Sequence, residues 1–456
     1  METSNEIFIF IGALLVLLAA AVQRMMPSPP VTCVGIDLGT TFSCVAVFED
    51  GEITVINSLG GREITPSVMF APNDGSDFVV GENARQTAAA SPGTLVYDAK
   101  RFIGKRYSHA SAVDEARGLP FTLVPGMSAV RGQLEPHLRF DSAGQPTRLA
   151  PEDVGTLIVH QLKTAAEKYI GRTVENAVLA VPVGFNAWQI NATKHAAIAA
   201  GLNVLRTIHE PTAAAMAYGL HTNSQVHTVM VYDIGGGTLD VSLLNLNNGI
   251  FEVMAASGDN RLGGQDFNLV ILEHLVATVA KRLKLEGAAV SRITDDAEAM
   301  RALREEAERI KIDLNDEADC SGRFETGDAG VVEVALPAAL AAAAPLTVDR
   351  PTFERISQPL LQRAIEPVHA VLRKVGMAVE EVDELVLVGG SSRMARIRQL
   401  LRELMNDREP NCDVSPEEAV AHGTAIQAAI LTDRKKIAVG ATEAALHAHI
   451  EGSVER

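Results

Sequence analysis

Two copies of one short pattern carry the residues best suited to chemistry. Residues 34–41 read Val-Gly-Ile-Asp-Leu-Gly-Thr-Thr, and residues 230–238 read Met-Val-Tyr-Asp-Ile-Gly-Gly-Gly-Thr. In each copy an apolar run ends in an aspartate, Asp37 or Asp233, and a turn of Gly and Thr follows. Glycines let the backbone approach a ligand closely, and successive N–H groups in such a turn bind anions. The repeat therefore predicts two phosphate-gripping hairpins that face one metal-bound nucleotide.

A third glycine turn lies at residues 385–393, where Leu-Val-Leu-Val runs into Gly389, Gly390 and Ser391. This pattern is typical of a strand that turns into a helix, and helix N-termini attract anions. An ordinary βα turn would have the same sequence pattern. Neither hairpin is a P-loop, and neither contains the G-x-G-x-x-G of a dinucleotide fold.

Apolar patterns predict the elements that position these turns. Strands are expected at 53–56, 67–70, 177–182 and 385–390. Helices are expected at 153–170, 186–200, 211–220, 294–314, 353–374 and 394–404. Thr294 is the expected N-cap of the long amphipathic helix, because acidic residues follow it. The 196 residues between Asp37 and Asp233 are too many for a solenoid repeat and favour two lobes of a duplicated αβ fold.

The composition favours large folded units and argues against nucleic acid as a partner. Hydrophobic residues make up 47% of the 456 residues, enough for two or three domains. The net charge of −17 disfavours nucleic acid, because phosphate backbones attract basic surfaces. Cys33, Cys44, Cys320 and Cys412 show no C-x-x-C spacing, so neither a zinc site nor a disulfide framework is predicted. Cys44 lies in an apolar run and is expected in the core.

The N-terminal segment differs from the rest of the chain. Residues 7–22 carry no charge. This uncharged run is slightly longer than a typical signal-peptide core and at the short end for a membrane span. Three consecutive alanines supply a cleavage pattern, but the preceding residues hold two Glu and no Lys or Arg. We interpret residues 1–22 as a signal peptide, with an uncleaved anchor or a buried helix as alternatives. The Pro-rich residues 23–31 are expected to be a spacer.

Taken together, these segments resemble the 70-kilodalton heat-shock chaperone family, within the actin–sugar kinase–chaperone ATPase superfamily. The matching stretches follow the family's order, at residues 36–43, 97–104, 181–182, 209–215, 233–242, 262–267 and 388–393. The resemblance implies an α/β fold, the duplicated actin-like (ribonuclease-H-like) two-lobed ATPase fold with a central nucleotide cleft. Lobe I would span 32–220 and lobe II 221–431.

The resemblance also implies roles for individual residues. Asp37 and Asp233 would orient waters around Mg²⁺, while Lys100, Glu210 and Thr238 would act at the γ-phosphate and the attacking water. Phosphoryl transfer depends mainly on such positioning and charge neutralisation. The other matched positions would bind ATP or ADP: Gly39, Thr40, Thr41, Phe42, Gly235, Gly236, Gly237, Gly264, Glu308, Lys311, Asn315, Gly389, Gly390, Ser391 and Arg393.

Two further positions are similar to the family's relay between the nucleotide state and the outside, Pro182 and Arg101. One of the departures from the family concerns the expected contact with adenine. Most members have an arginine that stacks on adenine where this chain has Ile312, so cation–π and planar stacking are lost. This departure bears on nucleotide affinity more than on hydrolysis.

The C-terminal end is short. After Ile430 there are 26 residues, whereas a peptide-binding β-sandwich needs on the order of 100. Residues 432–456 are therefore expected to be a tail with no peptide-binding domain. An ATPase core with a hydrophobic leader fits the microsomal stress-70 branch of the family.

That branch implies a peptide-independent Mg²⁺-dependent ATPase of the endoplasmic reticulum lumen or microsomes, with membrane contact only through the leader. Implied partners are ATP, ADP, other chaperones and ubiquitin-like proteins, without nucleic acid. Two alternatives stay open, a nucleotide-dependent binding module with little turnover and a small-molecule kinase of the same superfamily.

Overall fold

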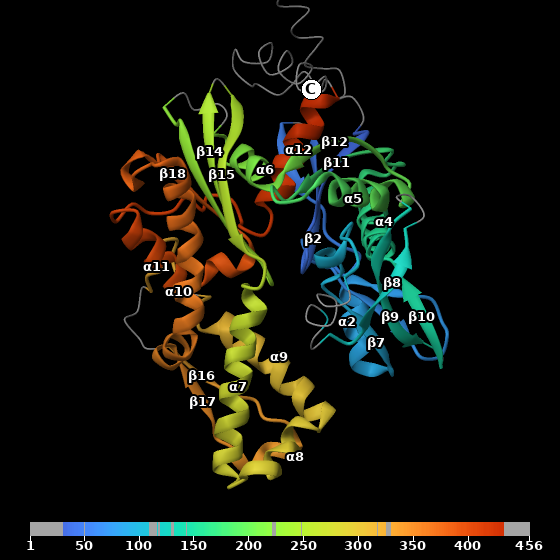
Figure 1. Ribbon diagram of the computed structural model, residues 1–456, viewed down its shortest axis with the longest axis vertical. Helices are drawn as coiled ribbons and strands as arrows, with labels where there is room; N and C mark the ends of the chain where they lie inside the picture. The colour runs from blue at the N-terminus through green and yellow to red at the C-terminus, as the bar shows by residue number, and fades with distance from the viewer. Residues whose placement is uncertain are drawn as a thin grey trace, which may run out of the picture.

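The computed structural model describes residues 31–432, apart from 50, 109–115, 117–118, 129–131, 143, 221–224, 248, 317 and 325–329. The predictions for the leader, for the spacer up to residue 30 and for the tail from residue 433 lie outside the described residues. No helix among the described residues is long and apolar enough to cross a membrane. Two main sheets, each with helices packed against it, form the body of the molecule (Figure 1).

The first main sheet is built around the strand that contains Asp37. Its strand order is β12-β11-β1-β2-β3, with β4 also paired to β2. β1 (Cys33–Leu38) pairs antiparallel with β2 (Phe42–Glu49) and parallel with β11 (Asn176–Val181). The predicted strand-turn-strand at residues 34–48 is thus confirmed. The other strands of this sheet are β3 (Glu52–Val55), β4 (Thr65–Pro66) and β12 (Asn203–His209).

The second main sheet repeats this plan around Asp233. Its strand order is β15-β14-β13-β18. β13 (Thr228–Ile234) pairs antiparallel with β14 (Leu239–Asn247) and parallel with β18 (Glu384–Val388), while β15 (Ile250–Asp259) lies at the edge. β1 and β13 therefore hold equivalent places, each between an antiparallel and a parallel neighbour. This equivalence is the structural form of the duplication predicted from the repeated motif.

Smaller sheets extend both halves of the molecule. They contain β5 (Met69–Pro72), β6 (Val79–Val80), β7 (Gly93–Val96), β8 (Thr122–Met127), β9 (Leu134–Ser142), β10 (Gln145–Leu149), β16 (Val331–Glu333) and β17 (Thr347–Asp349). β16 and β17 pair with each other in a part of the chain for which the sequence patterns predicted no strand.

The six predicted helices are present to within a few residues, and the structure adds helices at 81–90, 264–282, 291–294 and 419–431 that the sequence patterns did not predict. The helices are α2 (Gly81–Ala90), α4 (Pro151–Ile170), α5 (Ala187–Ala199), α6 (Glu210–Ala217), α7 (Gly264–Arg282), α8 (Ser291–Thr294), α9 (Ala297–Asp313), α10 (Arg350–Val375), α11 (Ala395–Leu404) and α12 (Ala419–Leu431). One boundary is wrong. Thr294 ends α8, and α9 is capped by Asp296, whose carboxylate accepts hydrogen bonds from the N–H groups of Glu298 and Ala299. Asp caps a helix as well as Thr does, and Asp296 lies nearer the first helical turn.

Helix α12 returns from the second half of the chain to the first sheet. A Cβ placed on Gly35 of β1 would lie 2.2 Å from the backbone nitrogen of Ala425 in α12. α12 also packs beside α6, and one buried cluster joins residues of both helices to residues of both main sheets (Figure 1). The glycine in β1 thus permits the close contact between α12 and the first sheet.

The proposed boundary between the lobes falls at residues 221–224, outside the described residues.

The cysteine spacing indicates no disulfide framework, but the described residues contain one disulfide. Cys320 and Cys412 are bonded, with Cα atoms 6.2 Å apart and 92 residues between them in the chain. Spacing rules detect only cysteines that are close in sequence or arranged in a known framework. Cys33 and Cys44 are buried, which confirms the expectation that Cys44 is a core residue.

Candidate functional site

The two glycine hairpins touch at Gly236, where only a glycine fits without displacing Thr41. A Cβ on Gly236 would lie 2.2 Å from Thr41 Oγ1, and a Cβ on Gly237 would lie 1.7 Å from Arg101 Nη2. Thr41 Oγ1 is buried, and no hydrogen-bond partner for it is present among the described atoms. Buried hydroxyls normally have a partner. A phosphate oxygen held between the hairpins would supply one, so these residues fit a nucleotide phosphate.

Four charged residues gather where the hairpins meet. Asp37 and Asp233 lie near the ends of β1 and β13, Glu210 opens α6, and Lys100 lies in the short 3₁₀ helix η1 (Ala99–Phe102). Lys100 Nζ donates to Glu210 Oε1 at 2.9 Å, with the two side chains only 8% and 12% exposed. The structure thus brings together four of the five residues predicted to act in catalysis, although they are far apart in sequence.

The cluster holds more negative charge than its one cation balances. Burial, and then the charge of Glu210, raise the pKa of Asp37 to about 7. Burial also raises the pKa of Asp233 well above its usual value. Burial lowers the pKa of Lys100, but the carboxylates of Glu210 and Asp37 outweigh it and the pKa is raised. A further cation at this place would relieve the repulsion between the carboxylates.

Mg²⁺ fits that requirement through its water shell. Within the part of the chain that the structure describes, no group of three or more His, Cys, Asp or Glu side chains is arranged to ligate a metal directly. Mg²⁺ loses its waters reluctantly and is usually bound by one or two carboxylates together with substrate phosphates. Asp37 and Asp233 are the residues that would hold those waters.

Asp240 belongs to the same cluster, although the sequence analysis gave it no role. It lies on β14 directly opposite Asp233 of β13. Burial, and then Glu210, raise its pKa to about 6. Asp233, Asp240, Glu210 and Pro182 line one small cavity. The signal that could have found it is the hairpin register, because a tight turn after Asp233 places Asp240 across from it.

Arg101 connects the two halves of the site. Its Nη2 donates to the carbonyl of Gly237 at 3.0 Å, and its Nη1 donates to the carbonyl of Asn260 at 3.2 Å. Its Nε lies 3.0 Å from the carboxylate of Asp98. Pro182 lies beside Glu210 in the cavity described above. Both positions suit a relay between the lobes, and that role stays a prediction.

The third glycine turn packs on the second hairpin. Gly389 has a φ of 78°, and a Cβ there would lie 2.4 Å from the carbonyl of Ile234. Ser391 Oγ donates to the carbonyl of Gly235 at 2.8 Å. The backbone at this turn is therefore within reach of whatever the hairpin binds.

Helix α9 and the turn after β18 form two walls beside the hairpins. Lys311 Nζ donates to the carbonyl of Gly264 at 3.2 Å, and a Cβ on Gly264 would lie 2.4 Å from Ser391 Oγ. Asn315 Oδ1 accepts from the N–H of Ala395 at 2.9 Å. Arg393 pairs with Glu417, Nη2 to Oε2 at 2.7 Å, a partner that the sequence analysis missed. Because the family resemblance predicts that they hold adenosine, we call these two walls, residues 308–315 and 389–393, the adenosine walls.

The remaining predicted residues lie around the same place. Thr40, Gly39 and Lys100 line a second small cavity under the first hairpin. Phe42 opens β2, with the Arg85 guanidinium 5.2 Å from its ring centre. Thr238 closes the second turn, where its carbonyl accepts from the N–H of Gly235 at 3.0 Å. Glu308 lies one helical turn before Lys311 on α9.

Comparison with known proteins agrees with this geometry. The family profile described as "Hsp70 protein" matches residues 33–440. The chain belongs to the Hsp70 family. A relative, "Heat shock 70 kDa protein BIP3" of Oryza sativa subsp. japonica, is 40% identical over 433 residues, which are 94% of this chain and 61% of the relative. The chain thus spans about three fifths of the length of the curated relative it matches.

Membership of the Hsp70 family confirms the predicted fold class. Members of this family are ATPases with the two-lobed actin-like fold. The match extends through both main sheets and through helix α12.

Replacing Ile312 by Arg should restore the stacking group that most Hsp70 proteins have on the adenine. Ile312 lies next to Lys311 on the first adenosine wall, and its side chain is 51% exposed. We expect Ile312→Arg to tighten ATP and ADP binding by about 0.5–2 kcal/mol, the range of cation–π contacts. Calorimetry on both proteins measures this, with Ile312→Met as a control that lengthens the side chain without a charge. Unchanged or weaker binding would contradict the assignment.

Replacing Asp37 by Asn should stabilise the nucleotide-free protein at high pH. The pKa of Asp37 is raised from its usual 3.8 to about 7, so the folded protein binds more protons than the unfolded chain between these pH values. The free energy of unfolding therefore falls as the pH rises through this window. Asp37→Asn removes the buried charge and should raise the thermal midpoint at pH 8 but hardly at pH 4.

The matched control is Glu52→Gln, which neutralises an exposed carboxylate on β3 and should have little effect at either pH. An Asp37→Asn variant that is less stable than the parent at pH 8 would show that the carboxylate is not destabilising in the folded state.

Proposed function

We propose that this chain hydrolyses ATP to ADP and phosphate in a Mg²⁺-dependent reaction between the two glycine hairpins. The observation that carries the proposal is the contact of the hairpins beside a buried lysine and four carboxylates. Its membership of an ATPase family supports the same function.

In the proposed reaction a water attacks the γ-phosphorus, the bond to the β,γ-bridging oxygen breaks, and ADP leaves. Lys100 would neutralise charge that develops on the γ-phosphoryl oxygens. Glu210 and Asp240, which line one cavity, would orient the attacking water and take its proton. Thr41 and Thr238 would donate hydrogen bonds to phosphate oxygens. When bound, Mg²⁺ would neutralise the phosphate oxygens electrostatically.

The decisive experiment is to measure ATP affinity and ATP turnover on purified protein of residues 31–456. Both measurable affinity and Mg²⁺-dependent turnover are expected. Tight binding with negligible turnover would favour a nucleotide-dependent binding module. Transfer of the phosphate to a sugar hydroxyl would favour a small-molecule kinase.

We further propose that the ATPase unit formed by residues 31–432 works independently of peptide. The strands of the described residues belong to the two main sheets and to the smaller sheets that extend them. A peptide can shift the lobe equilibrium only if it binds one arrangement better than the other. Steady-state turnover of this unit at saturating ATP should therefore be the same with and without extended hydrophobic peptides. A stimulation of several-fold would contradict the proposal.

We propose the endoplasmic reticulum lumen or microsomes as the location. The Cys320–Cys412 disulfide supports an oxidising compartment, and the uncharged residues 7–22 support a leader. Protease protection of the protein in isolated microsomes tests this. Other chaperones and ubiquitin-like proteins remain proposed partners, to be sought by crosslinking in the same preparation.

A further inference from the structure

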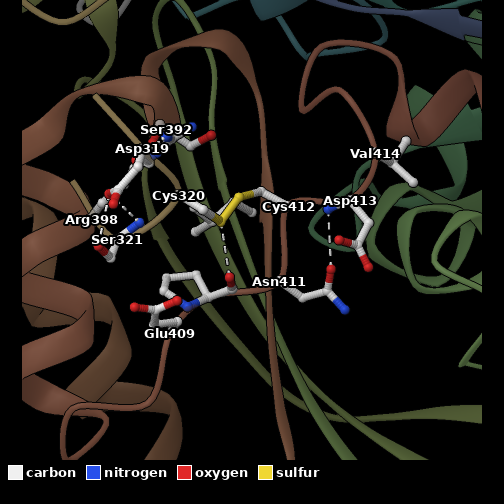
Figure 2. Close-up of a disulfide and its surroundings, with 12 residues drawn as sticks. Asp319, Cys320, Ser321, Ser392, Arg398, Glu409, Asn411, Cys412, Asp413 and Val414 are labelled. Carbon is white, nitrogen blue, oxygen red and sulfur yellow. Dashed lines mark hydrogen bonds between the residues drawn. A yellow bond between two sulfur atoms is a disulfide. The ribbon is translucent and has the colours of Figure 1, made fainter. Parts of the chain in front are cut away.

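The Cys320–Cys412 disulfide joins the hairpin that follows the first adenosine wall to the segment that supports the second. Cys320 lies five residues after Asn315, in a small hairpin in which Ala318 and Phe324 are bridged. Cys412 lies in the segment that runs beside β18, where Asn411 forms a parallel bridge with Val386 (Figure 2). The covalent bond thus links the hairpin after the first wall to the neighbour of the strand that leads into the second wall.

The same segment also supports the second wall through backbone contacts. The N–H of Asn411 donates to the carbonyl of Leu385 at 2.7 Å, and the N–H of Gly389 donates to the carbonyl of Pro416 at 2.8 Å. The next residue along, Glu417, orients Arg393. A displacement of Cys412 would therefore reach both the glycine turn and the arginine.

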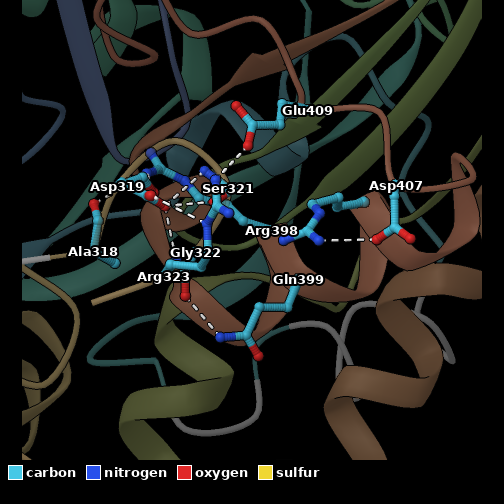
Figure 3. A network of polar contacts seen from close by, with 10 residues as sticks. Ala318, Asp319, Ser321, Gly322, Arg323, Arg398, Gln399, Asp407 and Glu409 are labelled. Atoms are coloured by element: carbon cyan, nitrogen blue, oxygen red, sulfur yellow. Dashed lines mark hydrogen bonds and ion pairs between the residues drawn. The ribbon is translucent and has the colours of Figure 1, made fainter. Parts of the chain in front are cut away.

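A polar network runs parallel to the disulfide (Figure 3). Arg398 is buried, its Nε donates to the carbonyl of Ser392 at 2.9 Å, and its Nη1 donates to the carbonyl of Asp319 at 2.7 Å. Gln399 Nε2 donates to the carbonyl of Gly322 at 2.7 Å. These hydrogen bonds hold the Cys320 hairpin against α11 and the second wall. The disulfide adds a covalent link from the same hairpin to Cys412.

We propose that the Cys320–Cys412 disulfide is a redox-controlled clamp on the adenosine side of the nucleotide site. The inference rests on the proposed nucleotide function. Both cysteines are partly exposed, so a thiol reagent can reach them, whereas Cys33 and Cys44 are buried.

A thiolate of a dithiol reductant attacks one sulfur of the disulfide and forms a mixed disulfide. The second thiolate of the reductant then breaks that mixed disulfide and frees the protein thiol. Two electrons and two protons give two protein thiols, and the dithiol leaves as a cyclic disulfide.

Reduction should weaken adenosine binding without removing the phosphate site. After reduction, non-covalent contacts hold the Cys320 hairpin in place, among them the Arg398 hydrogen bonds and the ion pair between Arg323 and Glu409, and the walls separate part of the time. Apparent affinity falls in proportion to the fraction of molecules with a competent site. The phosphate hairpins lie at the ends of β1 and β13, which the disulfide does not join.

The test compares Mg²⁺–ADP binding to the oxidised protein and to the protein reduced with a dithiol. We expect the dissociation constant to rise by about 3- to 10-fold on reduction, the scale of a site that is competent in a third to a tenth of molecules. The Cys320→Ser/Cys412→Ser variant should bind as the reduced protein does and should not respond to the dithiol. That variant keeps Cys33 and Cys44, so a remaining response would assign the effect to them and overturn the clamp.

Hydrogen–deuterium exchange provides a readout that does not depend on the variant's folding. Reduction should speed exchange at residues 315–324 and 409–417 and leave residues 37–42 and 233–238 unchanged. Equal ADP binding in both states, or thiol labelling that finds both cysteines free in protein purified without reductant, would overturn the clamp and leave the proposed function intact. Failure to bind ADP in either state would instead count against the proposed function.

Discussion

Replacing Lys100 by Ala is expected to lower ATP turnover by more than about 10²-fold, the usual scale for removing one group that stabilises transition-state charge. Lys100 is the cation in the cluster of Asp37, Asp233, Asp240 and Glu210, and its Nζ lies 2.9 Å from Glu210 Oε1. Charge on the γ-phosphoryl oxygens develops in the transition state more than in the ground state. Nucleotide affinity should therefore change little, because the adenosine walls and the glycine turns remain.

Single-turnover hydrolysis and calorimetry, measured on the same preparations, separate these two effects. Lys163→Ala is the matched control, because Lys163 lies on α4 in an ion pair with Glu167 within the same helix. It should leave both quantities unchanged. A Lys100→Ala variant that keeps more than about a tenth of the parent's turnover would place the catalytic charge elsewhere.

The sequence was sufficient to predict the hairpins, because their signals are local. An apolar run, an aspartate and a glycine turn specify β1 with β2 and β13 with β14, and the repeat of the pattern indicates the duplicated fold. Helical periodicity likewise located α4, α5 and α10 to within a few residues. The convergence of Lys100 and Glu210, 110 residues apart, carries no local signal and came from family resemblance.

The features that could not be predicted from the sequence depend on contacts between distant segments. The bond between Cys320 and Cys412 and the burial of Arg398 both require the hairpin after α9 to lie against α11, which no local pattern encodes. The seating of α12 on β1 similarly depends on a glycine whose neighbour is nearly 400 residues away in the chain. Asp240 is a nearer case, since the hairpin register fixes its place once the turn length is known.

Replacing Gly236 by Ala is expected to lower turnover by more than about 10²-fold, because a displacement of about 1 Å in a phosphoryl-transfer site has that scale of effect. A methyl group there would lie 2.2 Å from Thr41 Oγ1 and 2.7 Å from Thr41 Cβ. Rotation of the hydroxyl cannot relieve the contact with Cβ, which is fixed to the backbone. The two hairpins must therefore separate, and the groups that hold the phosphates separate with them.

The neighbouring residue provides the control, since Gly235→Ala adds the same methyl group to the same turn. The nearest atom to that methyl is the carbonyl oxygen of Thr238 at 3.9 Å, an ordinary contact. Turnover and ADP affinity should therefore fall steeply in Gly236→Ala and by much less in Gly235→Ala, while thermal unfolding reports whether each variant is folded. The two variants add the same methyl group, but only in Gly236→Ala does it meet the other hairpin. Equal losses of turnover would therefore show that the contact between the hairpins is not needed to position the phosphates, and the proposed site would have to be placed elsewhere.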